Sequence, residues 1–156
     1  MEKFSEAPNG FHPKDIFPDT KSVIVIAKRL PNGIFYTKDP VPYTSASSVI
    51  LHEVIRISCE LCIELERNNG FIAVPIPSEP YEYWDEDKKE GKGILSLKHA
   101  GYLAGLGSLG KNTLFVNREY GNRLILGAVL LNSALVDDQV YDYRFCHDAC
   151  TLCIDS

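Results

Sequence analysis

The chain has 156 residues, enough for one domain with a single core but not for two full domains. Hydrophobic residues make up 45% and charged residues 24%, which is typical of a globular protein and unlike a disordered or membrane-embedded chain. The formal net charge of -5 leaves no basic field for phosphate backbones, so we expect no direct nucleic-acid binding by this chain.

The cellular compartment follows from the amino-terminal residues and the cysteines. Residues 1–20 mix charged residues, polar residues and prolines, without the apolar segment of a secretory signal. The longest strongly apolar run, residues 124–131, is too short to cross a bilayer. The five cysteines are odd in number and clustered, which favours reduced thiols or metal ligands over a disulfide framework. We therefore expect a cytoplasmic protein that does not enter the membrane.

A buried strand and a long helix open the predicted fold. Residues 22–28 are rich in β-branched side chains, as in a strand covered on both faces, and turn residues follow at 31–33 before a short hairpin or loop. Apolar side chains then recur every three or four positions over residues 45–69, which predicts a helix. Gly70 suits the left-handed end of that helix. The candidate caps at its start are Ser45, Ser47 and Ser48.

The second half of the chain predicts further strands around a shorter helix. We expect a strand at residues 71–76, an exposed loop at 78–93 and a helix at 95–104. Strands at 113–117 and 123–131, joined by a turn, are expected to form an antiparallel hairpin. The predicted fold class is a single α/β domain in which helices flank a mixed sheet.

The glycine-rich loop, residues 105–112, is the first candidate site. It satisfies G-x-G-x-x-G and nearly satisfies G-x-x-x-x-G-K-S/T, but both motifs need a strand before and a helix after, and here that order is reversed. We therefore reject a Rossmann site and nucleoside triphosphate hydrolysis. Two interpretations stay open: backbone amides approach a flat or anionic ligand beside the Lys111 cation, or a tight turn packs helix on strand. The candidate cofactor-binding residues are Gly105, Gly107, Ser108, Gly110, Lys111 and Asn112.

The cysteine segment, residues 146–153, is the second candidate site. Cys146, Cys150 and Cys153 have C-x3-C-x2-C spacing, which lets thiolates converge on one metal centre, and we favour an iron-sulfur cluster. A zinc knuckle that also uses His147, or three free thiols, remains the alternative. Ferredoxin-type runs normally finish with C-x3-C-P, so we expect the sequence to end inside a longer motif, with its ligand set incomplete.

Other cysteines and histidines carry less chemistry. Cys59 and Cys62 form a C-x2-C pair inside the predicted long helix, where buried cysteine acts as a small hydrophobe, whereas redox pairs sit at a helix start. His52 and His99 also fall in predicted helices without an obvious ligand partner. We expect them to serve packing or the surface.

Residues 100–131, AGYLAGLGSLGKNTLFVNREYGNRLILGAVLL, together with the cysteine segment, closely resemble epoxyqueuosine reductase and its relatives, including reductive dehalogenase-like proteins. Those proteins carry an A-G-L-G-x-x-G-K-N-x-L segment, an N-x-E-x-G turn and a strand ahead of a ferredoxin-like module. Residues 17–26 also look like the first strand of that family. The matching positions are Ala104 to Asn112, Leu114, Asn117, Glu119 and Gly121.

The resemblance implies a fold, cofactors and a partner. Residues 1–145 would be a nitroreductase-like α/β domain with a cofactor pocket, and residues 146–156 the start of a truncated ferredoxin-like motif. Relatives hold a corrinoid near the glycine-rich loop and pass it electrons from two 4Fe-4S clusters. The chain would then be the N-terminal domain of a cytoplasmic iron-sulfur oxidoreductase. Its partner would be the C-terminal ferredoxin-like module of the same protein, and its substrate a small molecule or a modified nucleoside.

One departure from the family concerns the catalytic acid. The reductases carry an aspartate in a D-x-A-P context ahead of the glycine-rich loop, whereas residues 76–80 here read I-P-S-E-P. No aspartate matches, so we assign no catalytic residue and leave the substrate open. The alternative function is a non-catalytic scaffold that binds zinc or a protein partner through its tail.

Overall fold

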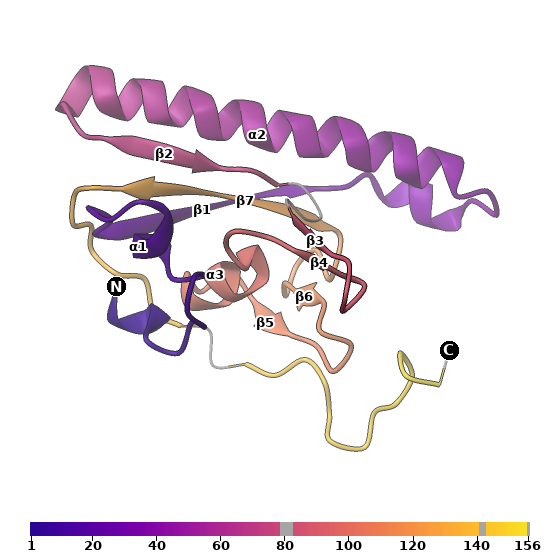
Figure 1. The fold of residues 1–156 in the computed structure, drawn as a ribbon. Helices are drawn as coiled ribbons and strands as arrows, with labels where there is room; N and C mark the ends of the chain where they lie inside the picture. Colours follow the sequence, from indigo (N-terminus) through magenta and orange to yellow (C-terminus); the bar gives the residue numbers. More distant parts are fainter. Residues whose placement is uncertain (79–82, 141–142, 156) are drawn as a thin grey trace.

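The main sheet has three strands in the order β1-β7-β2, in a computed structural model that describes residues 1–78, 83–140 and 143–155. The strands are β1 (Ser22–Arg29), β7 (Leu124–Leu131) and β2 (Ala73–Ile76), and β7 pairs antiparallel with both neighbours. Figure 1 shows the helix α2 (Val41–Asn69) along one face of this sheet, and α1 (Pro13–Ile16) and α3 (Leu97–Leu103) on the opposite side. The predicted α/β class is confirmed, but the sheet is not mixed as predicted, because every strand pair among the described residues is antiparallel.

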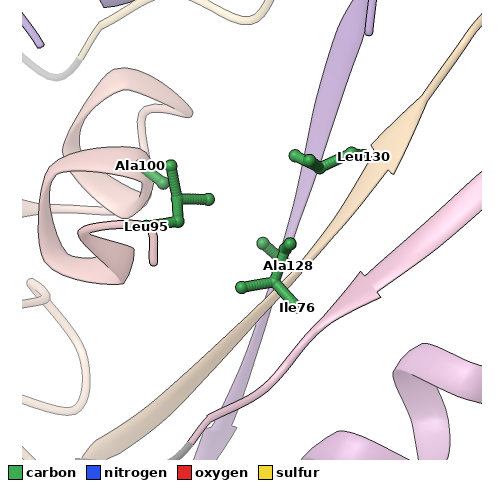
Figure 2. Packing of buried hydrophobic residues seen from close by; sticks show 5 residues of the cluster. All are labelled: Ile76, Leu95, Ala100, Ala128 and Leu130. Atoms are coloured by element: carbon green, nitrogen blue, oxygen red, sulfur yellow. The ribbon is translucent and has the colours of Figure 1, made fainter. Parts of the chain in front are cut away.

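Side chains of the central strand β7 alternate between two layers of core. Ala128 and Leu130 belong to the layer on the α3 side, which Figure 2 shows from close by. Val129 and Leu131 belong to the layer on the α2 side. Because both faces of β7 are covered, its apolar run lacks the alternation of a half-buried strand. The other buried members are Ile76, Leu95 and Ala100 on the α3 side, and Cys62 and Ala73 on the α2 side.

Helix α2 begins four residues earlier than the apolar pattern predicts. The residue before it is Pro40, and the carboxylate Oδ1 of Asp39 accepts the N–H of Val41 at 2.8 Å. Pro42 is tolerated in the first turn, where an N–H has no helical partner to lose. The serine caps were therefore wrongly predicted, because Ser45, Ser47 and Ser48 all lie inside the helix.

The other end of α2 agrees with the prediction. Gly70 adopts a left-handed conformation with φ of 65°, and its N–H donates to the carbonyl of Glu66 at 3.0 Å. Val54, Ser58 and Cys62 are its buried residues, and Leu61 and Leu65 of the apolar stripe are partly buried against the same core layer, so the stripe borders the face toward the sheet. Although α2 has 29 residues, no helix in the described part of the chain is apolar enough over a sufficient length to cross a bilayer.

Two short segments differ from the expected loops. The excursion after β1 is a 3-10 helix, η2 (Asn32–Tyr36), not a hairpin. The predicted loop at 78–93 contains a small antiparallel hairpin of β3 (Tyr83–Asp85) and β4 (Glu90–Lys92). The Nζ of Lys92 lies 2.9 Å from Oδ2 of Asp85, and this contact lowers the pKa of the Asp85 carboxyl and raises that of Lys92. An ion pair across the hairpin thus helps to order a segment whose composition resembles a loop.

The predicted hairpin between residues 113–117 and 123–131 is wrong. β6 (Phe115–Val116) pairs with β5 (Ser108–Leu109), inside the glycine-rich loop, and not with β7. β1 pairs with β7 along its whole length, and β2 takes the opposite edge at residues 128–131. β6 has its backbone partner in β5 instead, through the register Ser108↔Val116 and Leu109↔Phe115.

Candidate functional site

The glycine-rich loop follows α3 and turns back on itself as the β5–β6 hairpin. The N–H of Gly110 donates to the carbonyl of Leu114 at 2.8 Å, and the N–H of Thr113 donates to the carbonyl of Gly110 at 2.9 Å. Thr113 has a φ of 62°, and Asn112 Oδ1 accepts the N–H of Leu114 at 3.2 Å. Lys111 and Asn112 therefore stand at the tip of a tight turn, with the Asn112 side chain used to close it.

Two glycines of the loop lie directly against the chain's own backbone. A Cβ on Gly105, where φ is +74°, would stand 2.2 Å from the carbonyl oxygen of Gln139. A Cβ on Gly107 would stand 2.3 Å from the carbonyl oxygen of Val116. These contacts alone require glycine at both positions, in line with the tight-turn interpretation. The ligand role assigned to the loop stays a prediction.

Asn117 ties the loop to the turn that follows it. Its Nδ2 donates to the carbonyl of Leu106 at 2.6 Å, and its Oδ1 accepts the N–H groups of Glu119 and Tyr120 at 2.9 and 3.1 Å. Its backbone pairs with Gly121, which has a φ of 61°. The asparagine and the glycine of the N-x-E-x-G turn therefore have structural roles. The motif was recognised in the sequence, but these roles were not predicted from it.

A pocket of about 400 Å³ brings the two candidate sites together. Three of the six predicted loop residues, Ser108, Gly110 and Lys111, line it, and so does the predicted metal ligand Cys146. The Ser108 hydroxyl is buried and has no hydrogen-bond partner among the described residues, so a polar group of a ligand could satisfy it. The other lining residues are Tyr102, Leu109, Tyr143, Arg144 and Asp148.

Lys111 joins the loop to the cysteine segment directly. Its Nζ donates to the carbonyl oxygens of Asp148 at 2.5 Å and Cys150 at 2.9 Å. Two of the three N–H donors of the ammonium are thus engaged by this segment. The lysine predicted to meet an anionic ligand lies instead, in this structure, against backbone carbonyls.

The cysteine segment has thiols that could ligate a metal, but they do not converge on one point in this structure. Cys146 and Cys150 are half-buried and Cys153 is exposed, and the N–H of Cys150 donates to the carbonyl of His147 at 3.0 Å. Over residues 1–78, 83–140 and 143–155, no three Cys, His, Asp or Glu side chains converge as a metal site requires. The thiols suit iron or zinc by chemistry, but their positions do not form a finished site.

A corrinoid fits the pocket only in part. The volume of about 400 Å³ lies at the lower end for small-molecule sites, and a complete corrinoid with its peripheral side chains is larger. The buried Ser108 hydroxyl, which has no hydrogen-bond partner in the described ranges, and the backbone of Gly110 in the pocket wall would suit one edge of such a group.

The remaining candidates divide between core and surface. Cys62 is buried as predicted. Burial raises the pKa of its thiol to about 11, with smaller contributions from the nearby Cys59 and Glu66. The prediction was wrong for Cys59, which lies on α2 but is exposed. His52 Nδ1 lies 2.7 Å from the Ser48 carbonyl oxygen and His99 Nδ1 lies 2.7 Å from Ser96 Oγ. Both histidines are exposed, so of the packing or surface role expected of them the structure shows the surface role.

Ser78 marks the region where the reductases carry an aspartate. Its hydroxyl is buried without a hydrogen-bond partner among the described residues, and it lines a pocket of about 200 Å³ with Lys98 and Asn122. Glu79 and Pro80, the rest of the departure noted in the sequence, lie outside the described residues.

No family model matches the chain. A curated epoxyqueuosine reductase from Lactococcus garvieae is 46% identical over 52 residues, which are 33% of this chain and 14% of that protein. An epoxyqueuosine reductase structure from Streptococcus thermophilus covers 92% of this chain with a TM-score of 0.61 and 21% identity. The predicted resemblance to epoxyqueuosine reductases is confirmed. A third relative, an epoxyqueuosine reductase solved with an epoxyqueuosine-modified tRNA stem loop, covers 92% of the chain with a TM-score of 0.65 and 22% identity.

The epoxyqueuosine reductase likeness concerns the fold of this chain over most of its length. The chain spans only 37% and 36% of the two solved relatives. What those whole proteins do is therefore a matter for proposal.

Proposed function

We propose that this chain is the cofactor-pocket part of a cytoplasmic iron-sulfur oxidoreductase related to epoxyqueuosine reductase. Residues 1–145 form the pocket domain and residues 146–156 begin a ferredoxin-like module, which continues in the same protein as its partner. The observation that carries this proposal is the pocket of about 400 Å³, whose wall contains both the glycine-rich loop and Cys146. A cofactor bound there would stand next to the thiols that would hold the electron-carrying cluster.

The metal ligands in this proposal are Cys146, Cys150 and Cys153. Their spacing and their thiol chemistry support a 4Fe-4S cluster, which would transfer single electrons when bound. The segment around them is irregular and mostly exposed, so it can rearrange to gather the thiols. The cofactor residues are Gly105, Gly107, Ser108, Gly110, Lys111 and Asn112, and a corrinoid is the candidate ligand.

A modified nucleoside is the substrate class that the relatives suggest. One of them is described with an epoxyqueuosine-modified tRNA stem loop. Residues 76–80 lack the aspartate of the family. The proposal therefore includes a different proton donor or a different small-molecule substrate.

Anaerobic reconstitution with iron and sulfide tests the cluster. We expect the protein encoded by the complete gene to show broad visible absorbance, and the double variant Cys150→Ala, Cys153→Ala to lose it. Cys59→Ala is the matched control, because Cys59 is also exposed but lies on α2. Unchanged colour in the double variant would rule out the ligand assignment. A colourless protein with stoichiometric zinc would favour the alternative, a non-catalytic zinc-binding scaffold.

Titration with cobalamin tests the pocket. We expect a change in the cobalamin spectrum on binding, and weaker binding by Ser108→Ala. Because the Ser108 hydroxyl has no partner among the described residues, its removal should leave the stability of the fold nearly unchanged. Equal affinity of both proteins would mean that the corrinoid does not use this pocket.

A further inference from the structure

The described residues between 133 and 150 contact the body of the protein at several points along their length. The N–H of Leu135 donates to Ser22 Oγ at 2.8 Å, the Nζ of Lys3 donates to the carbonyl of Asp138, and Gln139 lies against Gly105. Figure 1 shows this stretch running past α3 and β5, on the side of the sheet opposite α2. Lys111 makes the next contacts, at Asp148 and Cys150.

The Lys111 contacts fall inside the cysteine segment. Both acceptors are backbone carbonyls, at residues two positions apart, and one belongs to a predicted ligand residue itself. An ammonium between two carbonyls restrains the path of the main chain whatever the side chains do. The lysine is held in turn by the tight β5–β6 turn, through the pair of hydrogen bonds between Gly110, Thr113 and Leu114.

We propose that Lys111 is a positioning residue that fixes the cysteine segment against the glycine-rich loop. This inference rests on the proposed function, in which the thiols of that segment hold a cluster. The loop then sets the distance between the cofactor pocket and the thiols, and Gly105 permits the approach of the chain that leads to them. Lysine is favoured at this position because it donates to two carbonyls at once from a long, adaptable side chain.

Amide hydrogen exchange on the reduced chain without iron tests this proposal. In Lys111→Met we expect exchange at the Cys150 amide to rise on the order of tenfold, as when one charge-assisted hydrogen bond that holds a segment is lost. Lys111→Arg keeps the cation and should return the rate to within about threefold of the wild type. Lys38→Met, at an exposed lysine in the loop before α2, is the matched control and should change nothing.

Trypsin cleavage after Arg144 provides a second measurement on the same variants. Arg144 lies two residues before the cysteine segment and lines the pocket, and Lys111→Met adds no cleavage site there. Faster cleavage in Lys111→Met than in Lys38→Met is the expected result. If Lys111→Met is poorly folded, Lys111→Gln, which retains a neutral donor, is measured in its place.

Two outcomes would overturn the proposal. Exchange at Cys150 that is unchanged in Lys111→Met would show that the contact restrains nothing. An equal rise at the amides of β7 would show a loss of stability of the whole fold and not a local release. Neither hydrogen exchange nor trypsin cleavage uses iron, so these tests are separate from the test of the cluster. If Lys111 restrains the segment but the protein stays colourless on reconstitution, only the cluster is rejected. If the protein is coloured but Lys111 restrains nothing, only the role of Lys111 is rejected.

Discussion

Gly105 illustrates how one residue of the candidate loop is constrained. Its φ of +74° lies in the left-handed region, and a Cβ there would also meet the Gln139 carbonyl oxygen at 2.2 Å. The constraint therefore has two parts, one from the backbone conformation and one from a neighbour far along the chain. The glycine-rich motif, which was predicted to bind a ligand, thus contains a glycine that the fold itself requires.

Three alanine substitutions separate these two parts. Gly105→Ala should lower the free energy of unfolding by more than the roughly 1–3 kcal/mol that left-handed strain alone costs, because the clash adds to it. Gly10→Ala, with φ of +85° and open space, should show the strain alone. Gly33→Ala, with open space and no positive φ, should be nearly neutral. Urea unfolding of the three variants checks the order, and equal losses for Gly105 and Gly10 would show that the Gln139 contact relaxes without cost.

At the scale of elements, α2 packs tightly against the central strand. A Cβ on Gly127 of β7 would stand 2.5 Å from Cγ1 of Val54, which is fully buried on α2. The helix and the sheet therefore pack closer at this point than they could if residue 127 carried a side chain. This contact sets the separation of the two layers near the middle of the sheet.

A double-mutant cycle measures that contact. Gly127→Ala alone should destabilise the fold by about 1–3 kcal/mol through overpacking, and Val54→Ala alone by about 2 kcal/mol through lost burial. The double variant should lose less than the sum, because the smaller residue 54 makes room for the new methyl group. Thermal or urea unfolding gives the coupling energy. Strict additivity would mean that α2 shifts away from β7 instead.

Charge is the property of the whole molecule that bears on its substrate. The chain carries a formal net charge of -5, while one solved relative is described with a modified tRNA stem loop. We expect this chain by itself to bind such a stem loop more weakly than about 10⁻⁴ M at physiological salt, the weak end of non-specific binding. Fluorescence anisotropy over a range of salt concentrations measures this. Micromolar binding that falls steeply with salt would instead reveal a local basic surface.

The sequence by itself determined the nature and approximate position of the main elements. The β-branched run of β1, the three-to-four-residue period of α2 and the glycine that ends it are local patterns, and the structure has all three. The family resemblance also came from a short contiguous motif. Local chemistry is enough in these cases because each pattern reflects the burial or backbone conformation of its own segment.

Only the tertiary structure decided which segments meet. β7 pairs with β1 and β2, and its neighbour in sequence, β6, pairs with β5, although local patterns favoured a hairpin of β6 and β7. Lys111 reaches the carbonyls of Asp148 and Cys150, 37 and 39 residues away, where every residue type has the same acceptor. A contact to backbone leaves no trace in the identity of the residue contacted, so the link between the loop and the thiols appears only when the chain is folded.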